Sequence, residues 1–141
     1  MLRPLGKSNG IRVVAADDNR QVRDKIVQLL KADFDVIGTA ADGKAVLELV
    51  MVLEPEVVVL DISMPVMSGI EAAAEITKRA YKTKIVFLTV HDDSDFVKAA
   101  LGVGASGYVV KSQMATDLRA AIIAASEGKK FISSSCAVVE D

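Results

Sequence analysis

Three acidic residues follow apolar runs at two places in the chain. Asp17 and Asp18 come directly after the run Ile11–Ala16, and Asp61 follows the run Val57–Leu60. Carboxylates that meet in a partly dry site repel one another, so they need a cation. Oxygen ligands without histidine or cysteine favour magnesium over zinc. These acidic residues therefore predict a magnesium site, provided that the fold brings them together.

Asp61 is also a candidate nucleophile, because carboxylates can form aspartyl-phosphate intermediates. Phosphoryl transfer depends mainly on positioning and charge neutralisation, which a metal on one side and fixed donors on the others can supply. Thr89 and Lys111 lie at the ends of two further apolar runs and offer a hydroxyl group and a positive charge. Thr89 could bond a phosphoryl oxygen only when one is present. This set predicts a switch that senses phosphorylation.

The candidate residues can meet only if the preceding runs form one parallel sheet. Short β-branched runs alternate with longer segments of helical period, which is typical of such a sheet with helices on its faces. The runs are almost continuously apolar, as expected for interior strands. We expect five strands, at Ile11–Ala16, Asp35–Thr39, Val57–Leu60, Lys84–Thr89 and Gly107–Val110. Ligands bind outside the carboxyl ends of such strands, where the strand order reverses.

Apolar residues at helical spacing predict five helices. The first two contain Val22, Ile26, Leu29 and Leu30, and Val46, Leu49, Val50 and Leu53; the others lie near Ile70–Ala80, Ser94–Gly102 and Thr116–Glu127. Ser68 or Gly69 and Asp93 or Ser94 are suitable N-caps, and Gly128 is a cap signal after the last helix. The sequence thus predicts a doubly wound α/β fold in which a βα unit is repeated five times.

Composition excludes several classes of protein. With 141 residues, 51% of them hydrophobic and 26% charged, the chain can bury the core of one domain. A formal net charge of -2 argues against a basic nucleic-acid-binding face. The single cysteine, Cys136, excludes an intramolecular disulfide, and we expect an inert thiol. The sequence shows neither a membrane span nor a secretory signal, so we expect a cytoplasmic protein.

The motifs Asp17-Asp18, Asp61-Ile-Ser-Met-Pro65, Gly69, Thr89 and Lys111 together resemble the signature of response-regulator receiver domains of two-component systems. The resemblance implies a flavodoxin-like, CheY-like three-layer sandwich with the parallel strand order 2-1-3-4-5. We expect an N-terminal arm at residues 1–10, the receiver domain at residues 11–128, and a linker or truncated tail at residues 129–141.

The resemblance implies a set of magnesium ligands. Asp18 would bind the ion directly and Asp17 would bind it through a water. Asp61 and the backbone carbonyl of Ser63 would complete the protein ligands. Manganese could substitute for magnesium.

The resemblance also implies how a phosphoryl group is handled. Asp61 would accept it from a sensor histidine kinase or a phosphotransfer protein, and Thr89 and Lys111 would contact it. Tyr108 would turn inward as the switch aromatic. His91, two residues after Thr89, is expected in a loop where it could influence how water reaches the aspartyl-phosphate.

Three segments, Leu88–Asp93, Gly104–Tyr108 and Lys111-Ser112, resemble the NarL/FixJ-type (LuxR-family) subfamily in particular. Such proteins usually carry a C-terminal helix-turn-helix domain, so control of transcription and contact with DNA would require a domain that is absent from this chain. A homodimer that forms on phosphorylation is a further hypothesis. Ile122 and Ile123, in the alanine-rich last helix, either offer a dimer face or pack on the sheet.

Other functions are less consistent with the residues. The pattern at Gly102, Gly104 and Gly107 matches a dinucleotide fingerprint, but it follows a helix and precedes a strand, which is the reverse order. A flavin site would place phosphate against Asp17 and Asp18. A phosphatase would need a second aspartate where this chain has Ser63. A scaffold that is never phosphorylated stays an alternative, and we expect a signalling switch that only phosphorylates and dephosphorylates itself.

Overall fold

Parallel strands form a single sheet in the computed structural model, which describes residues 10–80 and 82–136. Within this part of the chain the strand order is β2-β1-β3-β4-β5-β6. The strands are β1 Arg12–Ala16, β2 Asp35–Ala40, β3 Val57–Leu60, β4 Lys84–Thr89, β5 Gly107–Val110 and β6 Phe131–Ile132. The helices are α1 Arg20–Leu30, α2 Gly43–Leu53, α3 Gly69–Arg79, α4 Ser94–Gly102 and α5 Met114–Ser126, and the 3₁₀ turn Lys111–Gln113 precedes α5.

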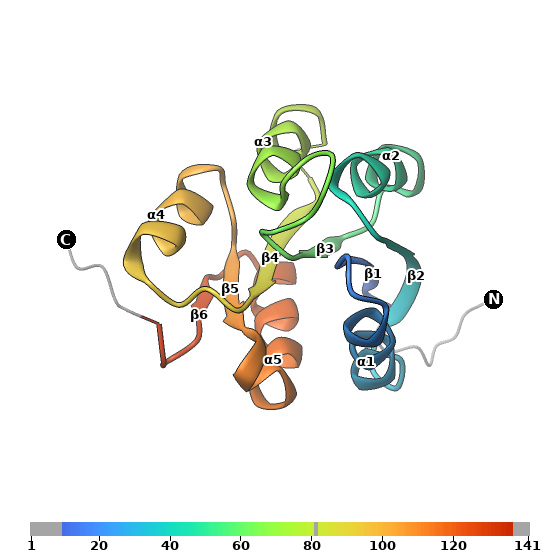
Figure 1. Ribbon diagram of the computed structural model, residues 1–141. Helices are drawn as coiled ribbons and strands as arrows, with labels where there is room; N and C mark the ends of the chain where they lie inside the picture. Colours follow the sequence, from blue (N-terminus) through green and yellow to red (C-terminus); the bar gives the residue numbers. More distant parts are fainter. Residues whose placement is uncertain (1–9, 81, 137–141) are drawn as a thin grey trace.

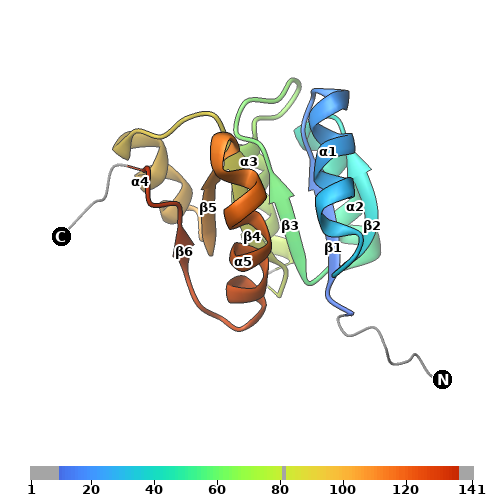
Figure 2. The same cartoon turned by 90° about the horizontal axis from the view of Figure 1, so that it is seen from below.

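The helices cover both faces of the sheet (Figures 1 and 2). Helices α2, α3 and α4 pack on one face, and α1 and α5 pack on the other. All four residues of β3 are fully buried, because this central strand is covered on both sides. The continuous apolar runs in the sequence are therefore explained by the two-sided burial, which confirms the predicted α/β sandwich. Every helix in the described part of the chain is too short or too polar to cross a membrane.

Local sequence signals explain most element boundaries. The predicted strands agree with the observed ones to within one residue, and three of the five match completely. Ser68 caps α3 in a capping box with Glu71, and Asp93 caps α4 by accepting a hydrogen bond from the Phe96 N–H. Helix α5 begins two residues earlier than we predicted, because the 3₁₀ turn leads into it without a side-chain cap that the sequence could reveal.

Strand β6 is absent from the prediction based on the sequence. Its two residues pair with β5 in the register Gly107 to Phe131 and Tyr108 to Ile132. A strand this short has no detectable period, so only the exposed edge of β5 identifies it. Within residues 129–136, which we expected in a linker or tail, Phe131, Ser133 and Cys136 pack at this edge. Residues 1–9 and 137–141 lie outside the described residues.

Burial in α5 shows whether Ile122 packs on the sheet or offers a dimer face. Ile122 is fully buried in the core between α1, α5 and the sheet, and Ile123 is partly buried against the same core. A side chain that is already buried against the sheet has no surface left for a second subunit. Ile122 therefore packs on the sheet and does not contribute to a dimer face.

Gly69, at the start of α3, lies against the loop that follows β3. A Cβ atom at this position would stand 1.9 Å from the carbonyl oxygen of Asp61 and 2.9 Å from the Cα of Ile62. Both atoms belong to the backbone and cannot swing aside. Helix α3 can approach this loop so closely only because residue 69 has no side chain.

We predict that Gly69→Ala lowers the free energy of unfolding by about 2–3 kcal/mol, since the new methyl group must displace the backbone next to Asp61. Gly102→Ala is the matched control, because a Cβ there meets nothing within 4 Å at the end of α4. The control should change stability by less than about 1 kcal/mol. Urea denaturation measures both variants, and equal stabilities would contradict the proposed close approach.

Candidate functional site

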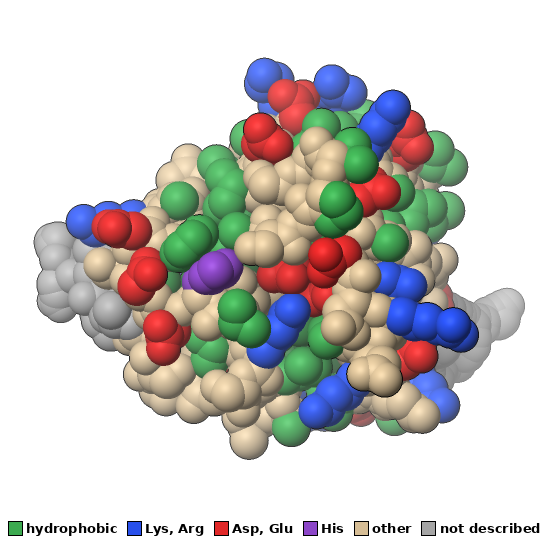
Figure 3. All heavy atoms as spheres, in the orientation of Figure 1, with side chains coloured by type: hydrophobic (Ala, Val, Ile, Leu, Met, Phe, Trp, Pro, Cys, Tyr) green, Lys and Arg blue, Asp and Glu red, His purple; other side chains and the backbone are tan. Residues whose placement is uncertain are grey.

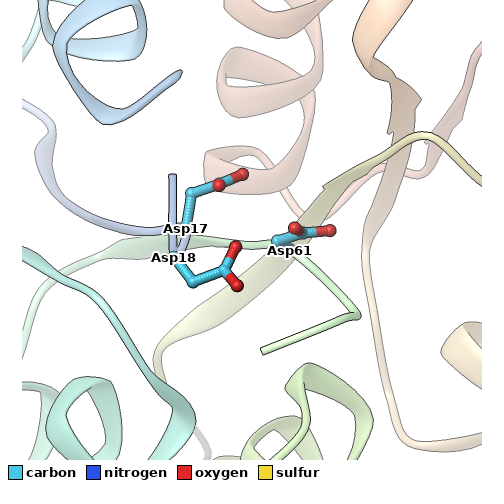
Figure 4. Close-up of side chains that lie close together, drawn as sticks. All are labelled: Asp17, Asp18 and Asp61. Atoms are coloured by element: carbon cyan, nitrogen blue, oxygen red, sulfur yellow. The ribbon is translucent and has the colours of Figure 1, made fainter. Parts of the chain in front are cut away.

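Three carboxylates gather at the carboxyl ends of β1 and β3. The two strands pair with Ala16 opposite Leu60, so the residues that follow them meet at one edge of the sheet. Figure 4 shows Asp17, Asp18 and Asp61 side by side, and one oxygen of each lies within 4.8 Å of the others. Asp17 and Asp61 are buried, whereas Asp18 is exposed. The predicted acidic cluster is thus formed.

Local hydrogen bonds hold the first acidic pair. Asp17 Oδ1 accepts a hydrogen bond from the backbone N–H of Asn19 at 2.9 Å, and the Arg23 guanidinium donates to the Asp17 carbonyl at 2.9 Å. Asn19 also caps α1 by accepting from the Val22 N–H. The sequence analysis did not assign Asn19 or Arg23 to the site. An asparagine before a helix is the only signal that was available for either of them.

Lys111 brings a positive charge to the buried carboxylates from the end of β5. Its Nζ lies 2.7 Å from Asp17 Oδ2 and 3.2 Å from Asp61 Oδ2. Asp17 Oδ2 is fully buried and accepts no aligned hydrogen bond among the described residues. The ion pair with Lys111 compensates for its buried negative charge. Burial alone would lower the pKa of Lys111, but its close contact with Asp17 and the charge of Asp61 outweigh this effect and raise the pKa. Lys111 is therefore charged at neutral pH.

The environment of Asp61 disfavours the ionised form of its carboxyl group. Burial raises the pKa of its carboxyl group, and the neighbouring charge of Asp17 raises it further. Lys111 lowers the pKa of Asp61 through its charge and a hydrogen bond, but the net shift is upward. The ionised form is thus less stable in the folded protein than in the unfolded chain.

Thr89 and Tyr108 meet at the same short stretch of backbone. Thr89 ends β4, is fully buried, and its Oγ1 accepts a 3.3 Å hydrogen bond from the N–H of His91. Tyr108 in β5 is also fully buried, and its hydroxyl donates a 2.7 Å hydrogen bond to the His91 carbonyl. Burial raises the pKa of Tyr108, so the phenol keeps its proton as a donor. The tyrosine therefore points inward.

His91 links the loops that follow β3 and β4. Its Nε2 lies 3.1 Å from the hydroxyl of Ser63, and its ring stacks on Phe96 with the centroids 4.0 Å apart. The sequence placed His91 in a loop, which is correct, but it gave no sign of these contacts. Ser63 is 28 positions from His91 in the sequence, and only the fold brings these two residues together.

The loop after β3 contains a strained turn. The Met67 N–H donates a 2.7 Å hydrogen bond to the Pro65 carbonyl across Val66, whose φ is 70°. This is a γ-turn, and a β-branched residue at positive φ is unfavourable.

Two valines near the site are largely exposed: Val66 in the loop after β3, and Val90 in the loop after β4. On this face the acidic side chains gather near the single histidine, with apolar side chains around them (Figure 3).

We predict that Asp61→Asn stabilises the metal-free protein at pH 7 by on the order of 1 kcal/mol, because it removes a buried carboxylate whose pKa is raised. The gain is complete above the raised pKa, shrinks as the pH falls through it, and vanishes below the ordinary value of 3.8, where Asp61 is protonated in both states. Urea denaturation with a chelator between pH 3 and pH 8 measures this. Asp24→Asn, on an exposed face of α1, is the control; a variant at position 61 that is destabilised at pH 7 contradicts the prediction.

Comparison with known proteins identifies the family. Residues 13–123 match the family described as the response regulator receiver domain. The chain is 33% identical over 126 residues to the transcriptional regulatory protein DegU of Brevibacillus brevis, and 39% identical over 121 residues to the regulator YxjL of Bacillus subtilis. These matches cover 88% and 84% of this chain but only 53% and 56% of the two relatives. The chain thus spans little more than half of their length.

Comparison with solved structures identifies the same family. The signal receiver domain of the regulator NarL from Mycobacterium tuberculosis superposes with a TM-score of 0.82 at 32% identity, covering 86% of this chain and 99% of that one. A LuxR-family response regulator from Aurantimonas superposes with a TM-score of 0.85 at 32% identity, covering 89% and 91%. The resemblance to NarL and LuxR-family proteins is therefore confirmed, and the chain belongs to the response regulator receiver domain family.

Proposed function

We propose that this receiver domain accepts a phosphoryl group on Asp61 from the phosphohistidine of a sensor histidine kinase or a phosphotransfer protein. The observation that carries the proposal is the cluster at the strand ends, where Asp61 lies beside Asp17, Asp18 and the ammonium group of Lys111. Family membership supports the same function. The domain is then a switch rather than an enzyme with turnover, and its own chemistry is limited to self-phosphorylation and autodephosphorylation.

The transfer step uses the Asp61 carboxylate as the nucleophile. One oxygen attacks phosphorus, a P–O bond forms, and the P–N bond to the donor imidazole breaks. The leaving nitrogen keeps the electron pair and takes up a proton. Lys111, 3.2 Å from Asp61 Oδ2, is placed to pair with an oxygen of the transferred group, and the Thr89 hydroxyl is a donor for a second one.

The acidic cluster fits a hard divalent cation. All three side chains offer oxygen, and Asp17 Oδ2 is buried without an aligned hydrogen bond among the described residues, which leaves it able to accept from a metal-bound water. Asp18 and Asp61 would bind magnesium directly, Asp17 would bind through a water, and the Ser63 carbonyl would be a further ligand. The ion supplies neutralisation of the carboxylate and phosphoryl charges, and manganese would serve as well.

Tyr108 is the proposed switch aromatic. If Thr89 turns its hydroxyl toward a phosphoryl group, it gives up the hydrogen bond from the His91 N–H. The His91 carbonyl accepts from the Tyr108 hydroxyl, so the loop connects the two residues. Phosphorylation of Asp61 would thereby change the packing between β4, α4 and β5.

The output of the whole protein is proposed to be control of transcription. Its relatives are named as transcriptional regulators, and a similar chain, RcsB of Salmonella typhimurium, has been solved as dimers on DNA. Contact with DNA would require a separate DNA-binding domain, since the formal net charge of this chain is -2. A homodimer on phosphorylation and a cytoplasmic location belong to the same proposal.

We predict a single phosphoryl adduct when the protein is incubated with acetyl phosphate and magnesium, because Asp61 is then an activated acceptor. Intact mass spectrometry reads the adduct directly. Asp61→Asn should remain unmodified, whereas the exposed control Asp24→Asn should behave like the wild type. An unmodified wild type that also fails with a phosphohistidine donor would favour a scaffold that is never phosphorylated.

We also predict that magnesium raises the melting temperature of the wild type in proportion to its binding. Asp18→Asn removes an exposed ligand and should weaken the apparent magnesium affinity at least about tenfold, while the fold stays intact. Thermal denaturation across a magnesium titration measures the affinity, again with Asp24→Asn as the control. Equal affinities for wild type and Asp18→Asn would remove Asp18 from the metal site.

A further inference from the structure

The segment Phe131–Cys136 lies along the outer edge of β5, beside the strand that carries Tyr108 and leads to Lys111. Strand β6 pairs with Gly107 and Tyr108 of β5. Figures 1 and 2 both show this segment running from the end of α5 past β5 toward α4. It therefore contacts the one strand that joins the acidic cluster to the switch tyrosine.

Ser133 is the centre of this contact. Its backbone N–H donates a 2.9 Å hydrogen bond to the carbonyl of Tyr108, and its Oγ accepts a 3.2 Å hydrogen bond from the Val110 N–H. The same hydroxyl donates a 2.8 Å hydrogen bond to Asp117 Oδ2 in α5. Ser133 is 1% exposed. This buried serine thus fixes the backbone of β5 at Tyr108 and at Val110, the residue directly before Lys111.

Cys136 continues the contact into the core. It is 4% exposed and belongs to the same buried cluster as Tyr108 and Val97 of α4. Its backbone N–H donates a 3.1 Å hydrogen bond to the Ser133 carbonyl, which ties the cysteine to the serine. Burial raises the pKa of the Cys136 thiol, so the thiol is unreactive while the segment is docked.

We infer that Ser133 is a positioning residue for Lys111 and Tyr108, and that docking of the segment Phe131–Cys136 on β5 is coupled to the phosphorylation state of Asp61. This inference rests on the proposed function and identifies the segment Phe131–Cys136 as the part of the chain that responds to phosphorylation. Val110 directly precedes Lys111, so the hydroxyl of Ser133 holds the backbone from which the lysine reaches Asp17 and Asp61.

Phosphorylation of Asp61 and docking of the segment restrain the same part of β5, which sets the sign of the coupling. A phosphoryl group on Asp61 holds Lys111 by charge and thereby restrains the end of β5. Docking of the segment restrains the same end of β5 through Ser133. Because both events favour the same ordered state, each must strengthen the other by the same factor. Phosphorylation therefore closes the segment more firmly on β5, and loss of docking weakens phosphorylation.

Cys136 reports docking without any label, because it is the single cysteine and is exposed to reagent only when the segment opens. We would follow its reaction with Ellman's reagent in the native wild type with magnesium, with and without acetyl phosphate, and read intact mass in parallel. The expected result is a rate at least about fivefold slower in the phosphorylated protein. Asp61→Asn should show one rate under both conditions.

The outcomes separate the two proposals. A phosphoryl adduct with an unchanged or faster thiol rate overturns the coupling and leaves the proposed function intact. The absence of an adduct in the wild type overturns the proposed function and the coupling that rests on it. A slower thiol rate that also appears in Asp61→Asn would show that acetyl phosphate acts elsewhere, and it too would overturn the coupling.

The reciprocal effect is tested with Ser133→Ala and the exposed neighbour Ser134→Ala. Ser133→Ala should speed the reaction of Cys136 and slow phosphorylation by acetyl phosphate, each by about fivefold or more, while Ser134→Ala matches the wild type. Circular dichroism checks that both variants are folded. A faster thiol with an unchanged phosphorylation rate would assign Ser133 a structural role only. If Ser133→Ala does not fold, the wild-type thiol measurement decides alone.

Discussion

Repulsion among three carboxylates is the constraint on which the rest of this structure depends. Unit charges about 4 Å apart near a protein surface interact with roughly 4 kcal/mol, and here Asp17 and Asp61 are also buried. Lys111 approaches both of them, yet one ammonium group against three carboxylates leaves an excess of negative charge. Burial raises the pKa of Asp61, and the charge of Asp17 adds to this shift. The excess of negative charge makes the cluster suited to a divalent cation.

The parallel sheet stabilises the fold enough to tolerate this concentration of charge. Strands β1, β3, β4 and β5 are neighbours and end at one edge of the sheet, where Asp17, Asp18, Asp61 and Lys111 meet. Their bodies are buried between two helical layers, and this packing stabilises the fold independently of the site. Unfavourable electrostatics, and a γ-turn at Val66, can therefore persist at the strand ends.

The site is connected to the rest of the molecule through short, specific contacts. His91 contacts Thr89, Tyr108, Ser63 and Phe96, so a single residue joins two loops, two strands and a helix. Beyond Tyr108, the buried Ser133 extends these contacts to the far edge of the sheet. The links to Ser63 and Tyr108, and the one from Val110 to Ser133, are hydrogen bonds between residues far apart in the sequence. A change at Asp61 has a physical route to the segment after α5.

The sequence by itself determined the five longer strands, the approximate positions of the helices and the polar residues at the strand ends, because apolar period and capping residues are local properties. Membership of the family followed from the same motifs. Tertiary structure decided that β6 forms, since a two-residue strand exists only where the edge of β5 offers it partners. It also decided that Lys111 approaches Asp17 more closely than Asp61, and that His91 contacts the hydroxyl of Ser63. Such contacts depend on the packing of distant segments, which no local pattern encodes.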